Sequence, residues 1–223
     1  EAYPALVSSY LGESLDAQLA SPGAFDHVIT YFVLEGKEYW VDGTISQQFG
    51  SLESRGEQYF AKALLVKADQ TALVDIAAPV LRKSFERSKE LFIISDYQTE
   101  VKLDTTFQYQ GDSAVYYRLA LQRLGQSEYE KHLLNYYQRQ FPNTELLPGL
   151  SIVDDRELNQ LQIEAKFKIK QFTNAQNNIE LPLFAETLAG YAELPDRVRR
   201  NMPLALEPDV VATHTVEYQL PEA

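Results

Sequence analysis

One histidine and one aspartate stand in a stretch that predicts a β-hairpin, and together they have the chemistry of a general base with its orienting partner. His27 opens a run rich in Val, Ile, Tyr and Phe, Asp42 ends the next such run, and Glu35-Gly36 lies between the two runs. β-branched and aromatic residues favour strands, and glycine favours the reversal of the chain. An imidazole can accept and return a proton near neutral pH, and a carboxylate beside it fixes which ring nitrogen carries that proton. Residues 25–44 are therefore the first candidate for a reactive site.

The register of this predicted hairpin decides whether the two side chains meet. If the loop is the two residues Glu35-Gly36, Ile29 faces Asp42 directly. Side chains alternate between the two faces of a strand, so His27 and Asp42 then share a face as diagonal neighbours, roughly 7 Å apart at Cβ. A three-residue turn with a glycine bulge instead shifts the register by one residue and places them on opposite faces.

The residue inventory narrows the chemistry available to these 223 residues. They include no cysteine, so neither a disulfide, a thiolate metal site nor a cysteine nucleophile is expected within them. The three histidines, His27, His132 and His214, form no short-spaced pair, so we expect no histidine metal site and no cofactor. His132 and His214 are given no role. Trp40, the only tryptophan, is expected to be a core residue.

Charge and hydropathy exclude further classes of partner. The formal charge of −12 repels phosphate backbones, so nucleic acid is not an expected partner. No run approaches the roughly 20 apolar residues of a membrane-spanning helix, so no membrane span is expected. Glu1 stands where a complete chain would start with methionine, a start expected of a processed or excised piece.

The order of expected elements predicts an α+β protein in two parts. We expect a β-rich first domain over residues 1–78, and a mainly antiparallel β domain over 79–223 with a helical insertion near 113–140. A polar, charged stretch at 79–91 predicts a linker or a frayed helix at the boundary. Strands are predicted at 1–9, 59–67, 73–76, 97–109, 152–155, 160–171, 179–183 and 210–220. Helices are predicted at 113–124 and 128–140, the second with a capping box formed by Ser127 and Glu130.

Two motifs around the hairpin resemble the transglutaminase-like Cys-His-Asp superfamily, in particular large bacterial proteins in which such a domain lies between β-rich domains. The motifs are Phe25-Asp26-His27-Val28 and Tyr39-Trp40-Val41-Asp42-Gly43-Thr44, preceded by the strand Ala2-Tyr3-Pro4-Ala5-Leu6-Val7. Weaker likenesses follow at Phe141-Pro142, Asp154-Asp155 and Arg199-Arg200-Asn201-Met202-Pro203-Leu204. The resemblance implies that His27 and Asp42 are catalytic, and that a helix carrying the cysteine would precede Glu1.

The resemblance also implies a function. The expectation is the C-terminal portion of a cysteine peptidase or acyltransferase that acts on amide or peptide bonds, inactive as these 223 residues because the nucleophile is missing. Its expected partners are a protein or peptide substrate, the missing N-terminal part, and a second copy of this chain. The resemblance favours an exported bacterial protein. The alternative from another class is a noncatalytic interaction or structural module in which the hairpin is only scaffold.

Overall fold

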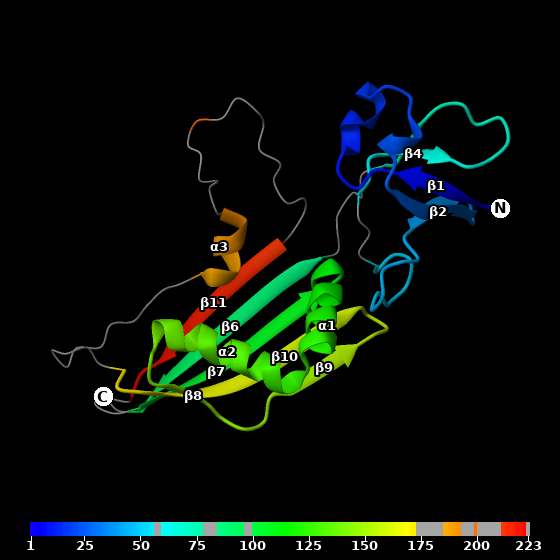
Figure 1. Cartoon of the computed structure of the whole chain (residues 1–223). Coiled ribbons are helices and arrows are strands. Elements are labelled where there is room, and N and C mark those ends of the chain that lie inside the picture. Colours follow the sequence, from blue (N-terminus) through cyan, green and yellow to red (C-terminus); the bar gives the residue numbers. More distant parts are fainter. Residues whose placement is uncertain are drawn as a thin grey trace.

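Two β-sheets, built from separate parts of the chain, make up the computed structural model (Figure 1). Strands of the smaller sheet lie within residues 2–75, and those of the larger sheet lie within 85–219. The predicted division at 78/79 falls between the sheets and lies outside the described residues. The structure describes residues 1–55, 59–77, 84–95, 100–172, 185–192, 199 and 211–221.

The smaller sheet is antiparallel throughout, with the strand order β3-β2-β1-β4-β5. Its strands are β1 (Ala2–Val7), β2 (His27–Leu34), β3 (Lys37–Val41), β4 (Lys62–Leu65) and β5 (Val74–Asp75). Two short 3₁₀ helices, Gly12–Ala17 and Pro22–Ala24, connect β1 to β2.

The β2–β3 hairpin has the two-residue loop that the sequence predicted. Leu34 pairs with Lys37, and Thr30 pairs with Val41. Glu35 and Gly36 both have positive φ, 52° and 79°, as the type I′ turn that suits the twist of a hairpin requires. The three-residue alternative is wrong, and the register that brings His27 and Asp42 to one face is confirmed.

Apolar side chains bury one face of this small sheet. The cluster consists of Ala5, Val7, Ile29, Phe60, Ala63, Leu65 and Ile76, with Tyr31, Trp40, Tyr59 and Val74 packed against it. Trp40 lies 4.6 Å from Tyr31, between ring centroids, and contributes to this core as expected. Strands on both sides of β1 are thus held by one hydrophobic layer, which fixes the position of the start of β2.

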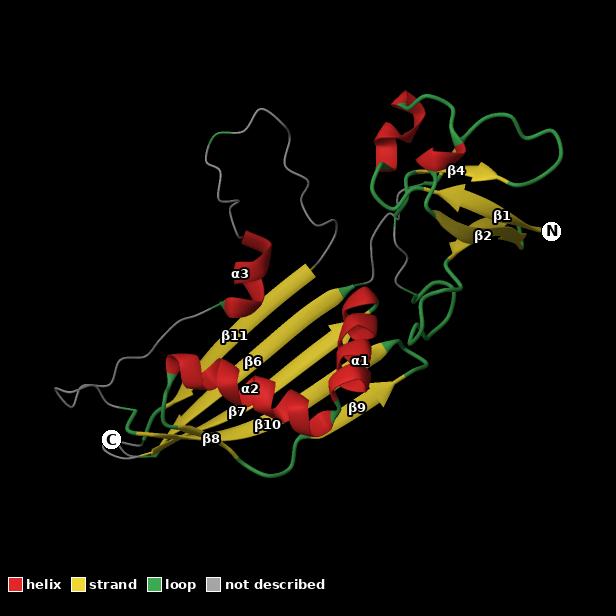
Figure 2. Ribbon diagram, viewed as in Figure 1, coloured by secondary structure: helices red, strands yellow, loops and turns green. Residues whose placement is uncertain are grey.

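The larger sheet has the order β11-β6-β7-β10-β8, and β9 also pairs with β10 (Figure 2). Its strands are β6 (Phe85–Ile94), β7 (Glu100–Gln110), β8 (Thr144–Leu146), β9 (Ser151–Asp155), β10 (Gln160–Lys170) and β11 (Val211–Gln219). β7 and β10 pair over eleven residues each, which confirms the predicted antiparallel core of the sheet. β11 departs from that pattern because it runs parallel to β6.

The charged stretch predicted as a linker or a frayed helix at 79–91 is a strand from Phe85 onward, and residues 79–83 lie outside the described residues. β6 alternates between buried Ser88, Glu90 and Phe92 and the exposed Arg87 and Lys89. Two of the inward residues are polar, so the period of two is hidden when only apolar letters are counted. Their hydrogen bonds within the fold explain why they tolerate burial.

Among the described residues, three helices accompany this sheet: α1 (Asp112–Leu124), α2 (Gln126–Gln140) and α3 (Glu186–Ala192). The predicted capping box is wrong, because Gly125 with φ 77° is the N-cap residue of α2, and Ser127 already lies inside its first turn. α3 and β8 were not predicted from the sequence. The predicted strand at 179–183 and residues 200–204 of the Arg199-Arg200-Asn201-Met202-Pro203-Leu204 motif lie outside the described residues.

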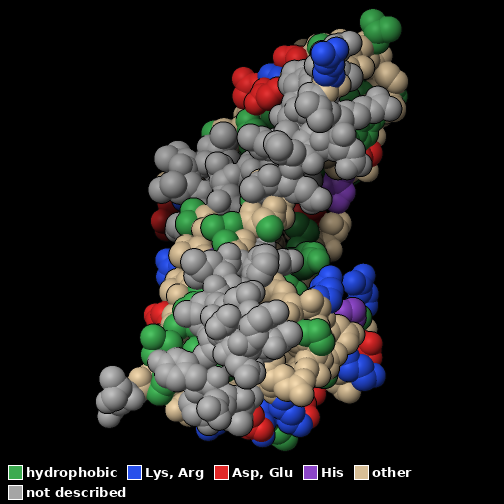
Figure 3. Space-filling view, turned by 90° about the vertical axis from the view of Figure 1, so that its left-hand side faces the viewer, with side chains coloured by type: hydrophobic (Ala, Val, Ile, Leu, Met, Phe, Trp, Pro, Cys, Tyr) green, Lys and Arg blue, Asp and Glu red, His purple; other side chains and the backbone are tan. Residues whose placement is uncertain are grey.

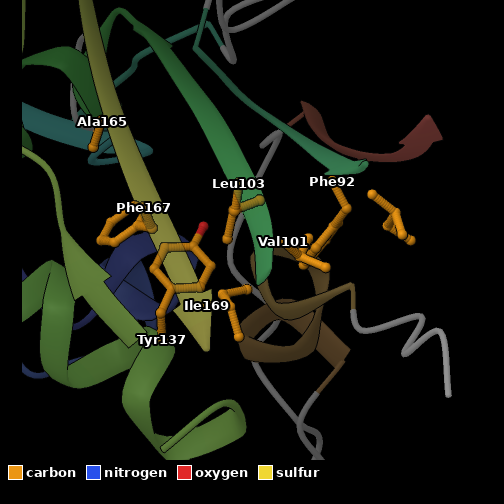
Figure 4. Packing of buried hydrophobic residues seen from close by; sticks show 8 residues of the cluster. Phe92, Val101, Leu103, Tyr137, Ala165, Phe167 and Ile169 are labelled. Carbon is orange, nitrogen blue, oxygen red and sulfur yellow. The ribbon is translucent and has the colours of Figure 1, made fainter. Parts of the chain in front are cut away.

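α2 packs on one face of the larger sheet and closes its core (Figure 4). The core cluster consists of Phe92, Ile94, Val101, Leu103, Tyr137, Ala165, Phe167 and Ile169. The other face of β7 and β10 carries Lys102, Asp104, Lys166 and Lys168, with Lys166 3.6 Å from Asp104. An antiparallel sheet with one packed and one solvated face gives this alternation. Among the described helices, none is long and apolar enough to cross a membrane.

A buried arginine on α1 connects the segment after Asp42 to the larger sheet. Arg118 is 5% exposed and donates hydrogen bonds to Asp154 Oδ1 at 2.7 Å and Asn159 Oδ1 at 2.6 Å. It also donates to the backbone carbonyl of Gln47 at 3.3 Å. The side chain of Asn159 in turn donates to the carbonyl of Ser54 at 3.3 Å. These bonds hold the loop that follows β3.

Candidate functional site

The hairpin brings His27 and Asp42 into direct contact. Nε2 of His27 lies 2.7 Å from Oδ2 of Asp42, within the distance expected for an orienting hydrogen bond. The His27 side chain is 27% exposed and that of Asp42 is 8% exposed. The carboxylate therefore lies deeper than the imidazole, and the pair presents the ring rather than the acid to its surroundings.

Asp42 is held ionised by donors on its other oxygen. Both the backbone N–H and the hydroxyl of Thr44 donate to Oδ1, at 2.8 and 2.7 Å. Burial raises the pKa of Asp42, but the hydrogen bonds from Thr44 and from His27 outweigh it, so the pKa lies below its ordinary value. A charged acceptor thus faces His27 at neutral pH.

An ionised carboxylate accepts hydrogen bonds and cannot donate them, and this fixes the tautomer of His27. Nε2 must carry the proton that Asp42 accepts, which leaves the lone pair of the neutral ring on Nδ1. Nδ1 makes no hydrogen bond with any residue that the structure describes. The nitrogen able to take a proton from another group is therefore the one turned away from Asp42.

The start of β2 is fixed by its neighbours on β1 and by Phe60. Val7 pairs with His27, and the amide of Asp26 donates to the carbonyl of Val7 at 3.2 Å. The carboxylate of Asp26 accepts from the amide of Ser9 at 2.8 Å and from its hydroxyl, and these bonds lower the pKa of Asp26. Phe60 lies against the imidazole, with ring centroids 5.8 Å apart. The backbone and the ring of His27 are both positioned by the fold.

His27 lines a wide groove, and Asp42 lines a small cavity behind it. The groove has a volume of about 1060 Å³, with Asp26, His27 and Thr44 among its lining residues. The rest of its lining is mainly apolar, from Leu6, Leu15, Leu19, Phe25, Leu64 and Leu73. The cavity that contains Asp42 has only about 10 Å³ of free space. His27 is thus a lining residue of the groove, and the apolar residues Leu6, Val28 and Leu64 line it from the other face of the sheet.

The remaining histidines do not join this pair. His132 is exposed on α2. His214 lies on β11, where its Nδ1 is 2.9 Å from Ser88 Oγ and its Nε2 is 3.4 Å from Glu90 Oε2. This polar cluster was not predicted from the sequence, because its members come from separate strands. The even spacing of Ser88, Glu90, Phe92 and Ile94 was the one sequence signal that pointed to it.

Neither a metal-binding cluster nor a surface of one charge accompanies the His27–Asp42 pair among the described residues. No group of three or more metal-ligating side chains occurs among the described residues. On the face shown in Figure 3, basic and acidic side chains lie close together between hydrophobic ones. The reactive potential of the hairpin therefore rests on the His27–Asp42 pair alone.

No protein-family model, curated protein or solved structure matches this chain. The resemblance to the transglutaminase-like superfamily therefore rests on the sequence motifs alone.

Proposed function

We propose that this chain is the C-terminal portion of a transglutaminase-like cysteine peptidase or acyltransferase that acts on amide or peptide bonds. The observation that carries the proposal is the 2.7 Å contact between His27 Nε2 and Asp42 Oδ2, in a register that leaves Nδ1 facing no described partner. His27 is the general base and acid, and Asp42 is the residue that orients it. The nucleophile is a cysteine supplied from outside these 223 residues, because they contain none.

In the proposed reaction His27 transfers protons and Asp42 stabilises the charge that His27 gains. Nδ1 of His27 takes the proton of the cysteine thiol, and the sulfur attacks the carbonyl carbon of the amide. The C–N bond breaks, and the imidazolium returns its proton to the leaving amine. Water or a second amine then attacks the thioester and frees the cysteine. The negative charge of Asp42 favours the imidazolium that exists between these transfers.

The groove beside His27 supports the same proposal. Its apolar lining and its volume of about 1060 Å³ suit a segment that packs against the sheet next to the start of β2, where His27 lies. A peptide substrate would approach His27 along the remaining part. The proposed partners are accordingly a protein or peptide substrate and the N-terminal part of the same protein, in an exported bacterial protein.

The first test is the coding sequence upstream of Glu1. A cysteine codon at the start of an amphipathic helix supports the proposal, and an upstream sequence without one contradicts it. The chain extended to include that helix should release ammonia or amine from glutamine-containing peptides. Activity should fall to background in His27→Ala and in the Cys→Ala variant, while His132→Ala, an exposed histidine on α2, should keep full activity.

The 223 residues by themselves should show no turnover of these peptides, because they lack a thiol. Turnover by the purified chain that His27→Ala abolishes would refute the assigned roles. An extended chain that folds, carries the cysteine and remains inactive would instead favour a noncatalytic interaction module.

The groove also makes a prediction about self-association. Leu19 lines it and is 91% exposed, so two copies can shield each other's apolar surface there. We expect the 223-residue chain to dimerise with rising concentration, as measured by light scattering. Leu19→Asp should weaken the dimer, whereas a substitution at Leu158, which is 55% exposed on the other part of the chain, should not. A monomer at all concentrations would contradict this expectation.

A further inference from the structure

A second cavity lies on the helix-covered face of the larger sheet. It has a volume of about 750 Å³, within the range of small-ligand sites. β6 and β7 supply Ser88 and Tyr109 to its lining, α1 and α2 supply Tyr116 and Tyr136, and α3 supplies Thr187. Figure 2 shows α2 lying across the strands and α3 beside β11. The cavity is distinct from the groove that His27 lines, because the two share no lining residue.

Tyrosine rings dominate the lining of this cavity. The tyrosines are Tyr109, Tyr116, Tyr117, Tyr129, Tyr136 and Tyr191. Tyr109 stacks on Tyr117 with ring centroids 3.7 Å apart, and Tyr116 meets Tyr117 edge-on at 5.2 Å. Tyr109 is 6% exposed, whereas Tyr116 is 67% exposed. The inner rings are therefore fixed by packing, and they support an outer ring whose surface is accessible to a ligand.

The floor of the cavity is polar and internally hydrogen-bonded. Ser88 Oγ lies 2.6 Å from Thr187 Oγ1 and 2.9 Å from His214 Nδ1. Glu90 accepts a hydrogen bond from the hydroxyl of Tyr137 at 2.7 Å, and its other oxygen lies 3.4 Å from His214 Nε2. This network joins β6, β11, α2 and α3. Hydroxyl oxygens have two lone pairs each, so the floor keeps capacity for bonds to a ligand.

The charges around the cavity are mixed. Arg87 and Arg139 stand against Glu86 and Glu90 in its lining. In a chain of net charge −12 this balance gives no field for a polyanion, which argues against single-stranded nucleic acid on the aromatic rings. The polar floor argues against a purely apolar ligand, because its groups would lose water without gaining hydrogen bonds. The lining matches a neutral ligand with both flat apolar faces and hydroxyl groups.

We propose that this tyrosine-lined cavity binds a neutral oligosaccharide. The sugar rings lie with their apolar C–H faces against Tyr116 and its neighbours, and their hydroxyls exchange hydrogen bonds with the tyrosine hydroxyls and the Ser88–Thr187 floor. Burial raises the pKa of Tyr109, Tyr117 and Tyr129, so their hydroxyls stay neutral donors at physiological pH. The inference is independent of the His27–Asp42 pair.

The test is titration of the purified 223-residue chain with cellohexaose, chitohexaose and maltohexaose, followed by calorimetry and saturation-transfer NMR. We expect at least one of the three to bind, with contacts to the cavity. Tyr116→Ala should weaken that binding about tenfold, as expected for the loss of one aromatic platform. Tyr116→Phe, which keeps the ring, should retain most of the affinity.

Tyr10→Ala is the matched control, because Tyr10 is also 67% exposed but lies beside the smaller sheet. It should leave the affinity unchanged. Failure of all three sugars to bind at about 10 mM would overturn the proposal. Equal effects of the Tyr10 and Tyr116 substitutions, with unchanged circular dichroism, would overturn it as well.

Discussion

Replacing Asp42 by asparagine should reverse the tautomer of His27. The backbone N–H of Thr44 can only donate, so the side-chain oxygen of the asparagine must stay on the Thr44 side of the site. The amide nitrogen then takes the place of Oδ2 and donates to Nε2 of His27, which in the wild-type chain is the donor at 2.7 Å. The ring proton moves to Nδ1, and the lone pair that acts as the base is lost from that nitrogen.

The energetic cost of this change can be worked out from the three bonds to Asp42. Hydrogen bonds to a charged group contribute about 1.5–3 kcal/mol each, against about 0.5–1.5 for neutral ones. Asparagine keeps all three hydrogen bonds, but as weaker neutral ones. The partial exposure of His27 reduces the energy difference between the charged and the neutral bonds. We expect a loss of about 2 kcal/mol in the free energy of unfolding. The chain should stay folded, because domains of this size are stable by about 5–15 kcal/mol.

Two measurements check this prediction. Long-range ¹H–¹⁵N correlation spectra at about pH 9, where histidines are ordinarily neutral, should show His27 with its proton on Nε2 in the wild-type chain and on Nδ1 in Asp42→Asn. The urea midpoint should fall by about 1 M. Asp69→Asn, at an exposed turn, is the control. An Nδ1 proton in the wild-type chain, or an unchanged tautomer in the variant, would refute the reasoning about this pair.

Three further predictions concern stability. Arg118→Met should lower the free energy of unfolding by about 3 kcal/mol, because it leaves buried acceptors unpaired, whereas Arg123→Met on the exposed side of α1 should change it little. Gly36→Ala should cost about 1 kcal/mol because φ is 79° there; Gly43→Ala is the control, and equal urea midpoints for the two would contradict this. The pKa of Asp42 is lower in the folded chain than in the unfolded one, so its contribution to stability is present above about pH 4 and is lost as the pH falls through the folded value. Urea midpoints from pH 7 to pH 2 should therefore fall less in Asp42→Asn than in the wild-type chain.

Local sequence patterns were sufficient to predict the hairpin and most of the strands. Glu35-Gly36 favours one turn type, that turn fixes the register, and the register places His27 and Asp42 on one face. The alternating apolar residues at 97–109 and 160–171 likewise predicted that each segment is a strand, as β7 and β10 are. These features depend on neighbours in the chain, and the pattern of side chains is therefore enough to predict them.

Only the tertiary structure decided what depends on residues far apart in sequence. β6 was predicted as a linker because Ser88 and Glu90 are polar. Their burial depends on hydrogen bonds with His214 of β11 and Tyr137 of α2, which are distant in sequence. The parallel pairing of β11 with β6 and the tyrosine-lined cavity likewise depend on contacts between segments that are distant in sequence. The sequence by itself determined which two side chains could form a base and its partner, since one short turn joins their strands. The groove beside His27 required the packing of distant segments, which local patterns do not specify.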